Sequence, residues 1–148
     1  MNILIIEDNS LKREKVTLLL DSIGDHTIME AASYNSGLTA AMDNEFDLMI
    51  VDMSMPTFDR SEHTQGGRFR AIAGKEIVAK LFKLGKLKPF IILTGFRDFS
   101  VDTQSLSIEQ IHDLLGTYGQ DYLGCIFFES SNTSWQEELT ATMEKFQC

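Results

Sequence analysis

Cysteine, signal segments and long hydrophobic runs are scarce or missing in this chain of 148 residues, and each scarcity excludes a class of protein. The two cysteines, Cys125 and Cys148, have no metal-binding spacing, so we expect both thiols to be reduced, as in a cytosolic protein. No apolar run approaches the roughly 18 residues that a membrane-spanning helix needs. The first residues enter an apolar segment without a basic lead, so no signal peptide is expected. The sequence therefore predicts one cytoplasmic globular domain over residues 1–148.

Only the middle of the chain has a net positive charge. The net charge is −9, yet residues 60–97 have a net charge of +7, while residues 1–59 and 98–148 each have −8. This basic island is typical of a solvated helix face rich in lysine, or of a docking surface for an acidic partner or an anion. Nucleic acid is not an expected partner, because the chain as a whole is acidic.

Short apolar runs alternate with segments of helical periodicity. Strands are predicted at 2–7, 26–32, 46–51, 89–94 and 124–129, with 26–32 the weakest of them. Helices are predicted at 10–23, 34–44, 74–85, 107–118 and 134–146. Five such units predict an α/β fold, namely a flavodoxin-like (βα)5 doubly wound parallel sheet with strand order 2-1-3-4-5. In such folds ligands bind at the carboxyl ends of the strands, here between the first and third strands.

Helix starts and long connections complete this outline. Capping boxes are predicted for Ser107 with Gln110 and for Ser134 with Glu137. Two connections are unusually long: an inserted loop at about 57–73 and a second one over 95–106. Loops of this length are uncommon unless they are functional or mobile.

Acidic and hydroxyl side chains follow three strands that the predicted topology makes neighbours. Glu7 and Asp8 end the first strand, Asp52 follows the third, and Thr94 ends the fourth. Three carboxylates meeting at one edge would repel one another, and Mg²⁺ relieves this repulsion while keeping water ligands that an incoming phosphate can replace. A carboxylate needs no general base at neutral pH, so the group suits phosphoryl transfer onto Asp52.

Three segments resemble the receiver domain of two-component response regulators: residues 5–9 (IIEDN), 51–56 (VDMSMP) and 92–95 (ILTG). The Asp-x-x-Met-Pro pattern is the most specific of them, and the resemblance covers most of the chain. It implies that Asp52 is the phospho-acceptor and that Thr94 is a switch hydroxyl. The resemblance also implies that Mg²⁺ is bound by Glu7, Asp8, Asp52 and the backbone carbonyl of Ser54.

The same resemblance implies the partners. A histidine kinase or a phosphotransfer protein would donate the phosphoryl group, and the signal would reach a downstream protein target by protein–protein contact. Such a domain is not an enzyme in the ordinary sense, since at most it catalyses its own phosphorylation and dephosphorylation.

One residue of the family pattern is missing. The family ends its fifth strand with a lysine that contacts the acceptor aspartate, but here the only lysine after Lys88 is Lys145, inside the last predicted helix. Counting back from that helix puts Glu129 at the lysine position, whereas matching residues 121–123 to the family puts Cys125 there. A glutamate would add repulsion against a phosphoryl group, at a cost of several kcal/mol in a partly buried site.

Two interpretations of this loss stay open. In the first, an arginine from the long connections replaces the lysine: Arg97 and Arg68 are the preferred phosphoryl contacts, with Arg60 and Arg70 also within the connections. In the second, the chain is a degenerate receiver that acts as a phosphorylation-independent protein-interaction module.

Overall fold

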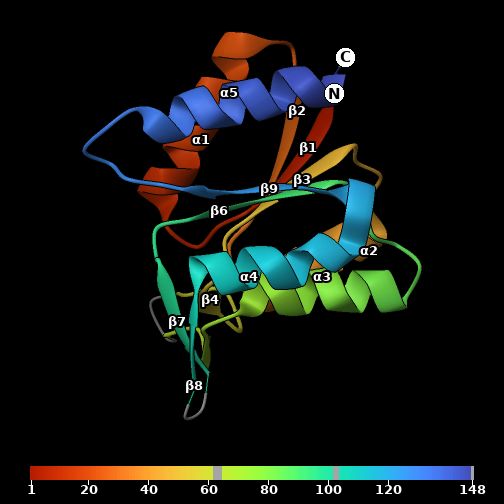
Figure 1. Ribbon diagram of the computed structural model, residues 1–148. Helices are drawn as coiled ribbons and strands as arrows, with labels where there is room; N and C mark the ends of the chain where they lie inside the picture. Colours follow the sequence, from red (N-terminus) through yellow and green to blue (C-terminus); the bar gives the residue numbers. More distant parts are fainter. Residues whose placement is uncertain (62–64, 102–103, 148) are drawn as a thin grey trace.

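A five-stranded parallel sheet forms the centre of the protein in a computed structural model that describes residues 1–61, 65–101 and 104–147. Its strands are β1 (Asn2–Ile6), β2 (Thr27–Ala31), β3 (Leu48–Val51), β6 (Phe90–Thr94) and β9 (Tyr122–Phe127), and their order is β2-β1-β3-β6-β9 (Figure 1). Since β6 and β9 are the fourth and fifth strands of this sheet along the chain, the predicted fold and the order 2-1-3-4-5 are confirmed. Cys148 lies outside the described residues.

Helices cover both faces of the sheet. Helices α1 (Ser10–Ile23) and α5 (Ser134–Gln147) pack on one face, and α2 (Tyr34–Asp43), α3 (Ala73–Lys83) and α4 (Ile108–Leu115) pack on the other (Figure 1). All four residues of β3 are buried, as a continuous apolar strand between two helical layers requires. None of the described helices is long and apolar enough to cross a membrane.

Side-chain caps set the helix starts. Asn9 caps α1 by accepting from the N–H groups of Leu11 and Lys12, and the predicted box of Ser107 and Gln110 forms at α4. The prediction of Ser134 as a cap is wrong, because Ser134 is the first residue of α5 and its own N–H donates to the side chain of Asn132.

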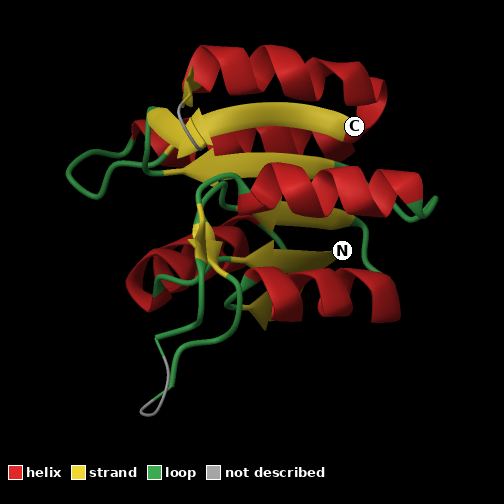
Figure 2. Cartoon of the chain, turned by 90° about the horizontal axis from the view of Figure 1, so that it is seen from below, coloured by secondary structure: helices red, strands yellow, loops and turns green. Residues whose placement is uncertain are grey.

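Both long connections contain short antiparallel strands. In the first, β4 (Met55–Pro56) pairs with β5 (Phe69–Arg70), and in the second, β7 (Asp98–Val101) pairs with β8 (Gln104–Ser107). A 3-10 helix, η1 (Gly116–Asp121), leads from α4 into β9. Figure 2 shows that the two strand pairs lie at one end of the sheet, the end to which the five parallel strands point. The β4–β5 and β7–β8 pairs therefore lie beside the edge of the sheet where a ligand is expected to bind.

Candidate functional site

Three carboxyl groups meet at the carboxyl ends of β1 and β3. Glu7, Asp8 and Asp52 each place a carboxylate oxygen within 4.8 Å of the others. The register explains the meeting, because Ile6 pairs with Val51 and the next residues along both strands are Glu7 and Asp52. The group opens into a cavity of about 560 Å³, which Ser54, Arg60 and Phe128 also line. The structure thus brings together the acidic residues that the sequence predicts to be close.

Glu7 is an acid in an unusual, largely dry environment. Its side chain is almost fully buried, and its carboxylate accepts from the N–H of Asn9 at 3.1 Å. Burial, and after it the nearby charge of Asp52, raise the pKa of Glu7 to about 8, although Lys12 acts in the opposite direction. Such a carboxyl gives up its proton readily only when a cation is available to replace it.

Asp52 is held rigidly at the end of β3. Its backbone N–H donates to the carbonyl of Ile6 at 3.0 Å, and its Oδ1 accepts from the N–H of Met53 at 2.7 Å. The backbone of Gly74, in the first turn of α3, passes so close that a Cβ there would lie 2.5 Å from the carbonyl oxygen of Asp52. Asp52 is 6% exposed and lines the cavity, so its carboxylate is accessible yet fixed in position.

Lys12 is a site residue that the sequence analysis missed. Its ammonium lies 2.5 Å from Glu7 Oε1 and 3.2 Å from Asp52 Oδ2, and it donates to the carbonyl of Leu93 at 2.7 Å. It is the only buried basic residue in the described part of the chain. One signal was available in the sequence: Lys12 lies four residues before Val16 on the buried stripe of α1, where an apolar side chain is expected.

Ser54 and Thr94 lie at the same edge of the sheet. The hydroxyl of Ser54 donates to the carbonyl of Ala71 at 2.6 Å, and Ser54 lines the acidic cavity. Thr94 is fully buried, and its hydroxyl accepts from the N–H of Phe96 at 3.3 Å. Thr94 therefore connects the end of β6 to the start of the β7–β8 connection.

The predicted arginines occupy different places. Arg60 forms an ion pair with Asp8 at 3.2 Å, and Arg70 pairs with Glu76 at 3.2 Å. The guanidinium of Arg97 instead lies 3.9 Å from the ring centroid of Phe127 and lines a second cavity, beside α4. The side chain of Arg68 is exposed. Neither of these two described residues lines the acidic cavity, and a contact of Arg97 or Arg68 with a phosphoryl group stays a prediction.

The end of β9 lies beside the acidic cavity, and the predicted lysine position can be located there. Strand β9 ends at Phe127, two residues before the predicted end, and the N–H of Phe128 donates to the carbonyl of Thr94 at 2.8 Å. Phe128 lines the acidic cavity, with its ring centroid 5.4 Å from the Lys12 ammonium. Glu129 turns away and accepts from the side chain of Asn132, while Cys125 lines the cavity beside α4. The residue of this strand end that faces the acids is therefore Phe128.

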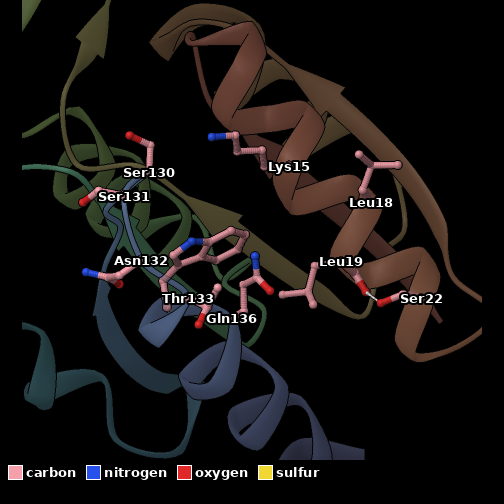
Figure 3. A pocket seen from close by; sticks show the side chains of 10 residues that line it. Lys15, Leu18, Leu19, Ser22, Ser130, Ser131, Asn132, Thr133 and Gln136 are labelled. Atoms are coloured by element: carbon pink, nitrogen blue, oxygen red, sulfur yellow. Dashed lines mark hydrogen bonds between the residues drawn. The ribbon is translucent and has the colours of Figure 1, made fainter.

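A further pocket lies on the other side of α1. Figure 3 shows Lys15, Leu18, Leu19 and Ser22 on α1 opposite residues 130–133 and Gln136. None of the predicted site residues lines it, and it holds no acidic side chain among the described residues. The acidic cavity, by contrast, is lined by Glu7, Asp8, Asp52 and Ser54, although not by Thr94.

The relatives found by comparison with known sequences include two of similar length, whereas no family model matches the chain. The chain is 28% identical over 143 residues to the Detocs response regulatory protein DtcB of Enterobacter cloacae (strain JD6301), covering 94% of this chain and 95% of that one. It is 25% identical over 140 residues to the uncharacterized protein y4jR of Sinorhizobium fredii, covering 92% of each chain.

Solved structures share the fold. Response regulator protein TrrA from Thermotoga maritima, in complex with Mg²⁺ and BeF, superposes with a TM-score of 0.66 at 21% identity, over 98% of this chain and 97% of that one. A CheY-like receiver domain protein from Methanospirillum hungatei JF-1 gives a TM-score of 0.64 at 19% identity, over 99% and 93%. The chain thus has the fold of response-regulator receiver domains and is similar in sequence to a response regulatory protein.

Proposed function

We propose that this chain is a signalling receiver that accepts a phosphoryl group on Asp52 in a Mg²⁺-dependent reaction. The observation that carries the proposal is the cluster of Glu7, Asp8 and Asp52 oxygens within 4.8 Å of one another, at the switch point of a receiver fold. The similarity to a response regulatory protein, and to a receiver solved with Mg²⁺ and BeF, supports the same chemistry.

The donor set suits Mg²⁺. Three carboxylates and the backbone carbonyl of Ser54 offer hard oxygen ligands, which Mg²⁺ prefers. The pKa of Glu7 is raised by burial and by the charge of Asp52, and a bound cation would offset both effects. Glu7, Asp8, Asp52 and the Ser54 carbonyl would hold the ion. When bound, it neutralises charge that develops on the transferred group.

The transfer itself needs positioning more than acid–base chemistry. A carboxylate oxygen of Asp52 attacks the phosphorus of a phosphohistidine on a histidine kinase or a phosphotransfer protein. The P–N bond breaks as the new O–P bond forms, and the electron pair stays on the imidazole nitrogen, which takes a proton from water. Because Met53 N–H already orients Asp52 Oδ1, the nucleophile enters the reaction in a fixed direction.

Thr94 connects phosphorylation to the surface. Its hydroxyl accepts from the N–H of Phe96 and still has its own proton, which it can donate to a phosphoryl oxygen on Asp52. The residues that respond first are those following Thr94, which lead into β7, β8 and α4. Output then takes the form of protein–protein contact with a downstream target, through a surface that differs between the two states.

The test is incubation of the protein with Mg²⁺ and acetyl phosphate, followed by intact-mass measurement. A one-phosphate gain is expected in the wild type and not in Asp52→Asn, which keeps the shape of the side chain and removes the nucleophile. Beryllofluoride binding, measured by calorimetry, is the non-covalent equivalent. A wild type that neither gains phosphate nor binds beryllofluoride contradicts the proposal and favours the phosphorylation-independent interaction module.

A further inference from the structure

We infer that Lys12 of α1 is the cation that contacts the phosphoryl group on Asp52, an inference that rests on the function proposed above. The contact replaces the strand-end lysine that this chain lacks. The positive charge then comes from helix α1 and not from the end of the fifth strand or from either long connection. Lys12 is then a catalytic residue in the direct sense, because its ammonium touches the carboxylate that reacts.

The position of the Lys12 ammonium supports this role. Its three neighbours are Glu7 Oε1, Asp52 Oδ2 and the carbonyl of Leu93, the residue before Thr94. The ammonium therefore lies between β3 and β6, on the wall of the cavity into which Asp52 opens. Arg60, by contrast, is half-exposed and pairs with Asp8 at the cavity edge. Arg60 is thus the cation paired with Asp8, and Lys12 is the cation paired with Asp52.

Phe128 explains why the cation comes from α1. It lines the cavity at the end of β9, and its ring lies 5.4 Å from the Lys12 ammonium. An aromatic side chain at this strand end leaves room for a lysine from the facing helix and packs against its charged end. Phe128 and Lys12 thus form a matched pair, in which the strand contributes the ring and the helix contributes the charge.

Fold stability alone gives no reason for a lysine at this place. Lys12 lies in the first turn of α1, where the helix dipole disfavours a cation, and on the buried stripe with Val16 and Leu20. A buried ion pair seldom stabilises a protein more than a well-packed apolar side chain does. A costly buried charge beside a nucleophile is the expected sign of a functional residue.

Lys12 has to move little during phosphoryl transfer to Asp52. During transfer a P–N or P–O bond to the donor breaks and the bond between phosphorus and Asp52 forms. The ammonium keeps all its protons and exchanges the contact with Asp52 Oδ2 for one with a phosphoryl oxygen. It also neighbours Glu7, a proposed metal ligand, so its charge opposes Mg²⁺ while it favours the anion.

This dual position leads to an experiment with two readouts. Beryllofluoride affinity in saturating Mg²⁺, and Mg²⁺ affinity alone, are measured by calorimetry for the wild type, Lys12→Met and the control Lys15→Met. Lys15 is an exposed lysine on the same helix. Lys12→Met is expected to weaken beryllofluoride binding at least tenfold and to tighten Mg²⁺ binding severalfold. Lys15→Met is expected to change both by less than twofold.

Opposite shifts of the two affinities distinguish an electrostatic contact from a packing role, since loss of packing would weaken both. Unchanged beryllofluoride binding in Lys12→Met overturns the inference and leaves the proposed function intact. Absence of binding and of phosphate gain in the wild type overturns the proposed function itself. The double variant Lys12→Met/Phe128→Lys is expected to regain most of the lost affinity, because it returns an ammonium to the cavity from the strand end.

A measurement on the unaltered protein covers the case in which Lys12→Met does not fold. With ¹⁵N-labelled lysine, the buried Lys12 ammonium is expected to give a signal protected from exchange with water. Addition of Mg²⁺ and beryllofluoride should shift this signal well beyond the shift that Mg²⁺ alone causes. A signal that beryllofluoride leaves in place, while calorimetry shows binding, overturns the role of Lys12.

Discussion

Glu7 should make the stability of the metal-free protein fall as pH rises. The pKa of its carboxyl is raised from 4.5 to about 8 in the folded state, mainly by burial and next by Asp52. In the unfolded chain the group has its ordinary pKa, so between these two values the folded state binds one proton more than the unfolded state does. The stability from this proton is present in full below the unfolded pKa and is lost as pH rises to the folded value.

The size of the loss follows from the shift. Each pKa unit corresponds to about 1.4 kcal/mol, so the shift of Glu7 amounts to about 4 to 5 kcal/mol in the free energy of unfolding. Glu7→Gln removes this dependence, because the amide has a similar shape and no proton to lose. At the acidic end wild type and variant should have similar stability. At the alkaline end the variant should be the more stable by nearly the whole amount.

Urea denaturation in the presence of a chelator measures both proteins at several values between about pH 5 and about pH 9. The difference between wild type and Glu7→Gln is the decisive quantity, since every other titrating group is common to both. A difference that stays constant across this range refutes the assignment of a raised pKa to Glu7. Added Mg²⁺ should remove most of the alkaline loss in the wild type and should have a smaller effect on the variant.

Three further predictions concern the same site and its support. Mg²⁺ affinity should rise with pH up to about 8, and near neutrality nearly one proton should be released from Glu7 for each ion bound. Calorimetry in buffers of different ionisation heat measures this release. An affinity that does not depend on pH would argue against Glu7 as a ligand. Gly74→Ala should lower the free energy of unfolding by about 2 to 3 kcal/mol, since the new Cβ would lie 2.5 Å from the carbonyl oxygen of Asp52. Gly85→Ala is the control, because its new Cβ meets no atom within 4 Å and the variant reports only the cost of the positive φ at that position. Trp135→Ala should cost about 3 to 5 kcal/mol in urea denaturation, because the ring is fully buried against the α1 side of the sheet, and a loss under about 1 kcal/mol would contradict this packing.

The acidic cluster was predictable because its members follow strands whose order the hydrophobic pattern determines. Continuous apolar runs such as Leu48–Val51 identify buried parallel strands, and the connection rules leave few arrangements for five of them. Once β1 and β3 are neighbours, residues that follow them must meet at the carboxyl edge. Glu7 and Asp52 therefore come together for a reason that can be read along the chain, and the capping box of Ser107 is local in the same way.

The cationic half of the site depended on distances across the fold. Lys12 reaches Asp52 from a neighbouring element, forty residues away in the sequence, and only the packing of α1 on the sheet brings its ammonium to 3.2 Å. The end of β9 could not be predicted from the sequence either. The pairing register shifts beside Phe90, and the strand starts at the half-buried Tyr122, before the apolar run from which the strand was predicted. Sequence alone thus determined the fold, its strand order and the meeting of the acids, since these follow from hydrophobic periodicity and strand ends. The tertiary structure alone decided which cation and which aromatic ring face the acids, since that depends on packing angle, register and side-chain reach.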